Sequence, residues 1–93
     1  MRREGEALSR TYIYDDRILA ELARHGLVPL PETPPEQLRD AISDLYRFEI
    51  RKLRRALLDG HIPKRDYTTR VVQLRTRYML LSLPLDAWAT AAR

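Results

Sequence analysis

Glu49 is the residue whose position best suits chemistry, because a carboxyl group stands where an apolar side chain is expected. At about 100° per residue along a helix, it falls on the apolar side, between Leu45 and Leu53. A carboxylate there needs a partner or must take up a proton, so we predict a buried polar group. It could serve as an acid or a metal ligand. We favour a bridge to a Tyr hydroxyl or an Arg of another helix, because no second acid or nearby histidine completes a catalytic set.

The other residues that could take part in catalysis or metal binding are His25, His61 and the pair Asp15–Asp16. Each histidine falls at the predicted C-terminal end of a helix, where an imidazolium suits the helix dipole, and the aspartates suit a helix start. The sequence has no cysteine and three glycines, which excludes thiolate metal sites and a glycine-rich phosphate loop. We therefore expect no enzyme, and we predict no catalytic residue, metal ligand or cofactor site.

Basic side chains are concentrated in one segment. Residues 47–77 carry ten basic and three acidic side chains, a net charge of +7, whereas residues 1–46 have a net charge of −3. Such a segment suits phosphate binding, so nucleic-acid binding is the alternative function. It could also be a solvated face or a docking surface for an acidic protein. The nucleic-acid candidates are Arg47, Arg51, Arg54, Arg55, Lys64, Arg65, Arg75 and Arg77.

The length of 93 residues predicts a single domain, 1–93, with a small core. The first ten residues contain no apolar segment of the kind found in signal peptides, and no apolar run is long enough to span a bilayer. Together with the absence of cysteine, this favours a cytoplasmic protein with no membrane span. No small-molecule substrate is indicated.

The N-terminal part predicts one helix between two irregular segments. Residues 1–9 are expected to be a flexible tail. A first helix is expected over about 15–25, ending at Gly26, and residues 27–33 form a Pro-rich connector. The run Tyr12–Tyr14 is either an exposed partner contact or an extra half-turn of the first helix.

The remaining sequence predicts a long antiparallel helical hairpin. The segment "TPPE" has the form of a capping box in which Thr33 and Glu36 bond each other's amides, so a helix should cover 34–59. A short turn leads to a second helix over about 64–81, and a last short helix is expected over about 84–91. The predicted fold class is therefore all-α: a small bundle of three main helices plus a short C-terminal helix, built on the hairpin 34–59 and 64–81.

The apolar stripe of the longest helix is wide, so more than one element must pack on it. Ninety-three residues are few for that task, and we predict a small non-catalytic helical interaction protein. It would be self-associating, as a homo-oligomer, or an accessory subunit of a larger assembly with a protein partner. The interface candidates at the stripe margins are Tyr46, Ile50, Leu57, Val72 and Met79.

The segment "LRRALLDGHIPKRDYTTRVVQL", residues 53–74, resembles the SHOCT (short C-terminal domain) family of bacterial helical hairpins. The matching positions are Gly60, Ile62, Asp66, Tyr67 and Arg70. Pro63 stands where that family usually has Thr, so the second helix begins differently. The resemblance implies an oligomerisation or interaction hairpin, possible nucleic-acid contact, and no catalysis.

Overall fold

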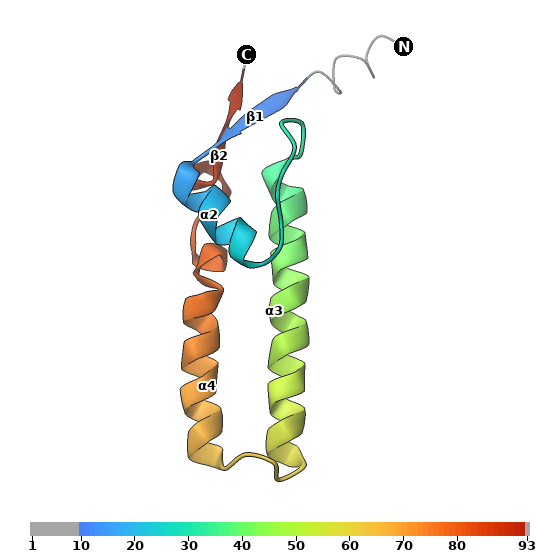
Figure 1. Cartoon of the computed structure of the whole chain (residues 1–93), viewed down its shortest axis with the longest axis vertical. Coiled ribbons are helices and arrows are strands. Elements are labelled where there is room, and N and C mark those ends of the chain that lie inside the picture. Colours follow the sequence, from blue (N-terminus) through green and yellow to red (C-terminus); the bar gives the residue numbers. More distant parts are fainter. Residues whose placement is uncertain (1–9, 93) are drawn as a thin grey trace, which may run out of the picture.

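The computed structural model describes residues 10–92. The described part begins with strand β1 (Thr11–Tyr14) and helix α2 (Asp16–Arg24). Two longer helices follow, α3 (Pro35–Leu58) and α4 (Lys64–Arg77), and they lie side by side as a hairpin (Figure 1). Two short 3₁₀ turns, η1 (Met79–Ser82) and η2 (Leu85–Ala87), lead to strand β2 (Ala89–Ala92). The predicted flexible tail, 1–9, lies outside the described residues.

The prediction of an all-α fold is wrong, because the two ends of the described chain pair as a two-stranded antiparallel sheet. Thr11 pairs with Ala92 and Tyr14 pairs with Ala89. The last predicted helix, 84–91, is instead the turn η2 followed by β2. Its alanines favour a helix locally, but β1 offers them an unpaired strand edge of β-branched and aromatic residues. Tyr12–Tyr14 is thus part of a strand and not a half-turn of α2.

The predicted ends of α2 and α3 agree with the structure at two glycines. Gly26 and Gly60 have φ values of 77° and 76°, a left-handed conformation that favours glycine. At Gly60, the amide of His61 bonds the carbonyl of Ala56 over 2.9 Å and closes the helix end. The third helix is shorter than predicted: α4 ends at Arg77, and a 3₁₀ turn replaces its expected last turn.

The predicted capping box at the start of α3 is wrong. Pro34 is the N-cap residue and no side chain caps the helix. The hydroxyl of Thr33 instead accepts a hydrogen bond from the amide of Leu30 over 3.0 Å, within the Pro-rich connector. Because Pro35 has no N–H, the first turn of α3 has one fewer donor to satisfy.

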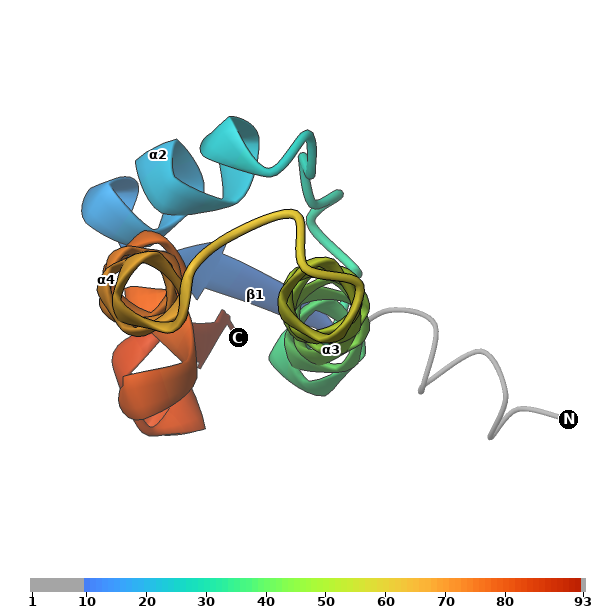
Figure 2. The ribbon, with the colours of Figure 1, turned by 90° about the horizontal axis from the view of Figure 1, so that it is seen from below.

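The core lies at one end of the hairpin. There α2 crosses one side of the α3–α4 pair (Figure 2), and the sheet closes the top. From α3 only Pro35, Leu38 and Ile42 are buried, and from α4 only Leu74. The buried apolar side chains are Tyr14, Ile18, Leu22, Leu38, Ile42, Leu74, Tyr78, Leu80 and Trp88.

Beyond this core the hairpin continues as an arm of two helices, residues 43–73. No residue of the arm is buried. The radius of gyration is 17.1 Å, against roughly 12 Å for a compact domain of this length. The arm therefore presents side chains on both flanks that no other described element covers.

Candidate interaction surfaces

The predicted interface residues of α3 lie on one side of that helix. Tyr46, Ile50 and Leu57 follow each other at spacings of four and seven along α3, so they share one helix face. All three are half-buried, whereas Val72 and Met79 are 56% and 46% exposed.

Two of the five residues line the same hollow. Tyr46 and Met79 line a hollow of about 360 Å³ together with Arg75, Tyr78, Leu81 and Ser82. The ring of Tyr46 packs edge-on against Tyr78, with centroids 5.3 Å apart. Val72 precedes Arg75 by one helical turn and lies about 160° around α4 from the buried Leu74, at the outer edge of that side. We call Tyr46, Ile50, Leu57, Val72 and Met79 the apolar flank.

The opposite flank has a groove between the two helices. It is a hollow of about 480 Å³ that both helices line. Leu53, Ala56 and Leu74 form its apolar floor; they are half-buried or buried. The polar lining is Glu49, Lys52, Arg70, Gln73 and Arg77. We call this hollow the basic groove.

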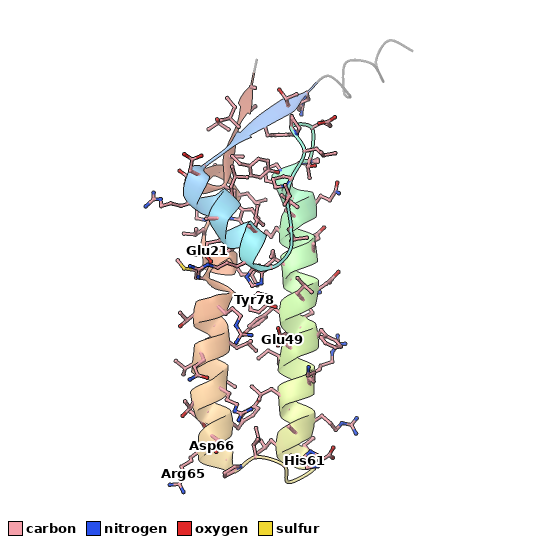
Figure 3. All side chains as sticks on the ribbon, viewed as in Figure 1. Glu21, Glu49, His61, Arg65, Asp66 and Tyr78 are labelled. Atoms are coloured by element: carbon pink, nitrogen blue, oxygen red, sulfur yellow. The ribbon has the colours of Figure 1, made fainter. Side chains whose placement is uncertain are left out.

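Glu49 lies at the upper end of the basic groove, between the two helices and facing Tyr78 (Figure 3). Its Oε2 accepts a hydrogen bond of 3.2 Å from the hydroxyl of Tyr78 and lies 3.7 Å from Nη1 of Arg77. The side chain is 35% exposed, so it is half-buried and not buried as predicted. The structure thus gives this carboxylate a Tyr and an Arg partner, both from the α4 side of the hairpin.

The same contact changes the acidity of Tyr78. Burial raises the pKa of the Tyr78 hydroxyl, and the charge and hydrogen bond of Glu49 raise it further, while Arg77 acts in the opposite direction. The tyrosine is therefore a donor to Glu49 at neutral pH. An acceptor carboxylate and a protonated phenol form a hydrogen bond here, with the Arg77 guanidinium and the His25 ring as neighbours.

His25 connects α2 to this cluster without reaching Glu49. Its ring stacks on Tyr78, with centroids 4.5 Å apart, and its Nε2 lies 3.1 Å from the carbonyl oxygen of Arg77. Nε2 of the imidazole thus contacts a backbone carbonyl and not the carboxylate of Glu49. His61 is exposed at the far end of the arm. Within residues 10–92, no group of three or more His, Cys, Asp or Glu side chains could hold a metal ion.

The eight nucleic-acid candidates are all exposed, but the helices separate them. Those of α3 lie between about 100° and 200° around the helix from Leu53, on the side away from α4. On α4, Arg65 points away from the buried Leu74, whereas Arg75 lines the hollow beside Tyr46 and Arg77 lines the basic groove. Arg47 is also paired with Asp44 at 3.1 Å. The candidates therefore do not form one continuous surface.

Sequence reasoning missed Lys52 and Arg70 as a pair. They come from different helices, and the register of the hairpin places both at the basic groove. Among the described residues, neither has a carboxylate within ion-pair distance. Lys52 lies 5.8 Å from the ring centroid of Phe48, itself 59% exposed. The excess positive charge of the hairpin indicates that a basic site exists, but it does not identify the side chains that lie together there.

No protein-family model, curated protein or solved structure matches this chain. The similarity of residues 53–74 to the SHOCT hairpin therefore stays a prediction. None of the described helices combines the length and the apolarity needed to cross a membrane.

Proposed function

We propose that this protein is a non-catalytic helical interaction protein, and that it self-associates through the apolar flank of its hairpin. One observation carries the proposal: the arm, residues 43–73, contains two long helices and no buried residue. Two helices alone leave their apolar side chains accessible to water, and a second pair would cover them.

The expected assembly is a dimer in which two hairpins pack flank to flank as four helices. Such a contact is isologous, because each copy presents the same residues to the other. Val72 and Met79 would become buried, and the hollow beside Tyr46 would receive an apolar side chain of the second copy. This arrangement would cover the C-terminal part of α3, beyond Tyr46 and Ile50, which already pack against the chain's own core.

Sedimentation velocity over a hundredfold range of protein concentration tests the proposal. The wild type should form a dimer, and moderate salt should not dissociate it, because apolar burial is not screened. Val72→Glu places a charge in the contact and should give a monomer. Val28→Glu is the matched control: Val28 is 82% exposed and lies in the connector, away from the apolar flank.

Two outcomes would contradict self-association through the apolar flank. A wild-type monomer at every concentration would leave an accessory subunit that needs another protein. Equal loss of the dimer in both Val→Glu variants would place the contact elsewhere. A labelled mixed-sequence oligonucleotide in the same sedimentation experiment tests nucleic-acid binding separately. An oligonucleotide bound through its phosphates would be released as the salt concentration rises.

A further inference from the structure

We infer that the basic groove is a second binding site, and that it receives an acidic amphipathic helix of a partner protein. The site lies on the flank opposite the proposed dimer contact, so it goes beyond self-association and does not depend on it.

The shape of the site suits a helix. The groove runs between α3 and α4, and its lining extends from Glu49 to Ala56 along α3 and from Arg70 to Arg77 along α4. His25, at the end of α2, contacts the carbonyl of Arg77 at the upper limit of this lining. Since α2 already crosses one side of the helix pair above (Figure 2), a bound helix would continue that covering layer down the arm.

The floor of the site favours a ligand with apolar side chains. Leu74 is 6% exposed, and beside it Leu53 and Ala56 are half-buried. Apolar groups placed on this floor would displace water from all three. A hollow of about 480 Å³ accommodates a few side chains of a helix, spaced three or four residues apart.

The charge of the site selects an acidic ligand. Lys52 and Arg70 stand at the two rims with no carboxylate partner among residues 10–92, whereas Arg77 at the upper end is paired with Glu49 at 3.7 Å. Carboxylates flanking the apolar side chains of a helix would meet these rims. The matching ligand is thus a helix with Leu-type residues on one face and Glu or Asp beside them.

A nucleic acid fits the same groove less well. Its phosphates would meet the cations, but its backbone has no apolar group for Leu53 and Leu74. Glu49 also stands in the lining and repels a polyanion. The exposed arginines on the outer faces suit phosphate contacts better than the groove does.

The test uses the full chain and a synthetic, labelled, end-capped peptide of about four helical turns. The peptide carries Leu at positions three or four apart and Glu on both sides of that stripe. Two further probes separate the apolar contribution to binding from that of charge: the same peptide with each Leu replaced by Ser, and a labelled single-stranded oligonucleotide. Binding is measured by fluorescence anisotropy at low and physiological salt.

Two double variants are compared. Lys52→Glu with Arg70→Glu reverses both rims of the groove. Arg54→Glu with Lys64→Glu makes the same change in charge at exposed positions that do not line it. Gln73→Trp fills the groove without changing the charge. Circular dichroism confirms that each variant is folded, and all five positions are exposed.

We expect the acidic Leu peptide to bind the wild type and the control variant with similar affinity. Lys52→Glu with Arg70→Glu should lower the affinity about tenfold or more, and Gln73→Trp should lower it as well. The inference is wrong if the Ser peptide binds equally, if the control variant loses as much affinity, or if the Leu peptide does not bind at about 1 mM. Binding of the oligonucleotide alone would also overturn it, in favour of a phosphate surface.

Discussion

The hydroxyl of Tyr78 donates a hydrogen bond to Oε2 of Glu49, 3.2 Å away and on the opposite helix of the hairpin. Tyr78 is 4% exposed and belongs to the core, whereas Glu49 belongs to the arm. The pair therefore lies at the boundary between the two parts. It positions α3 against α4 at the level where α2 ends, which also sets the upper limit of the basic groove.

Removing this hydrogen bond should destabilise the fold modestly. Tyr78→Phe keeps the ring that stacks on His25 and Tyr46, and we expect it to lower the free energy of unfolding by about 1 kcal/mol. Tyr67→Phe is the matched control, because Tyr67 is half-buried on the same face of α4 as Leu74 and its hydroxyl makes no hydrogen bond among the described residues. Urea unfolding measures both. Equal effects would show that the bond to Glu49 adds nothing specific.

Much of the helical framework follows from local sequence. The predicted ends of α2 and α3 lie within one residue of the observed ones, because Gly26 and Gly60 stop the helices and Asp15 starts one. The side chain of Asp15 accepts from the amide of Arg17 over 2.8 Å, as an N-cap should. These signals involve residues close in sequence, so a single chain reveals them.

The sheet and the basic groove depend on contacts between distant residues. Tyr14 and Ala89 pair as partners in the sheet, and nothing near Ala89 indicates a strand. Helical periodicity places Lys52 beside the apolar stripe of α3, but it does not show that Arg70 faces it across the hairpin. The same limit applies to the predicted nucleic-acid surface, because periodicity alone does not show whether the basic side chains of the two helices form one continuous surface.

Alkaline pH should destabilise the protein partly through Tyr14. Its hydroxyl donates to the carbonyl oxygen of Thr33 over 2.6 Å. Burial, followed by the charges of Tyr12 and Glu36, raises the pKa of Tyr14 from 10.0 to about 12. The folded pKa is above the unfolded one, so the stabilisation is complete below pH 10 and is lost as the pH rises towards 12.

The measurement is the free energy of unfolding between pH 8 and about pH 12, for wild type and Tyr14→Phe. Tyr14→Phe should be less stable at neutral pH by about 1 kcal/mol. Its stability should also fall less steeply in the alkaline range. Some alkaline loss should remain, because the pKa of Tyr78 is raised in the same direction. Parallel curves for the two proteins would contradict the role given to Tyr14.

Substitutions at Trp88 test how the C-terminal segment contributes to the core. The side chain is fully buried, and its Nε1 has no hydrogen-bond partner among the described residues. Trp88→Ala should cost about 3–5 kcal/mol. Trp88→Phe retains most of the apolar volume and removes an unsatisfied donor, so it should cost much less. Thermal unfolding compares the two. A similar loss in both variants would contradict the expectation that apolar volume dominates at this site.

Substitutions at Gly60 test the backbone geometry of the hairpin turn. A Cβ at this position would meet nothing within 4 Å, so any cost of Gly60→Ala comes from the left-handed backbone alone. We expect a loss of about 1 kcal/mol. Gly60→Asn should lose less, because asparagine tolerates this conformation better. If both substitutions destabilise equally in urea unfolding, the turn is limited by something other than its φ value.

The arm and the core should differ in hydrogen exchange. Because no residue from 43 to 73 is buried, opening the arm exposes less apolar surface than global unfolding does. At low protein concentration, the amides of the arm should exchange faster than that of Ile42 in the core. At high concentration, the proposed dimer should slow exchange in the arm, and Val72→Glu should abolish this effect while Val28→Glu should not. Arm amides that exchange as slowly as Ile42 in a dilute monomer would contradict an arm that opens independently.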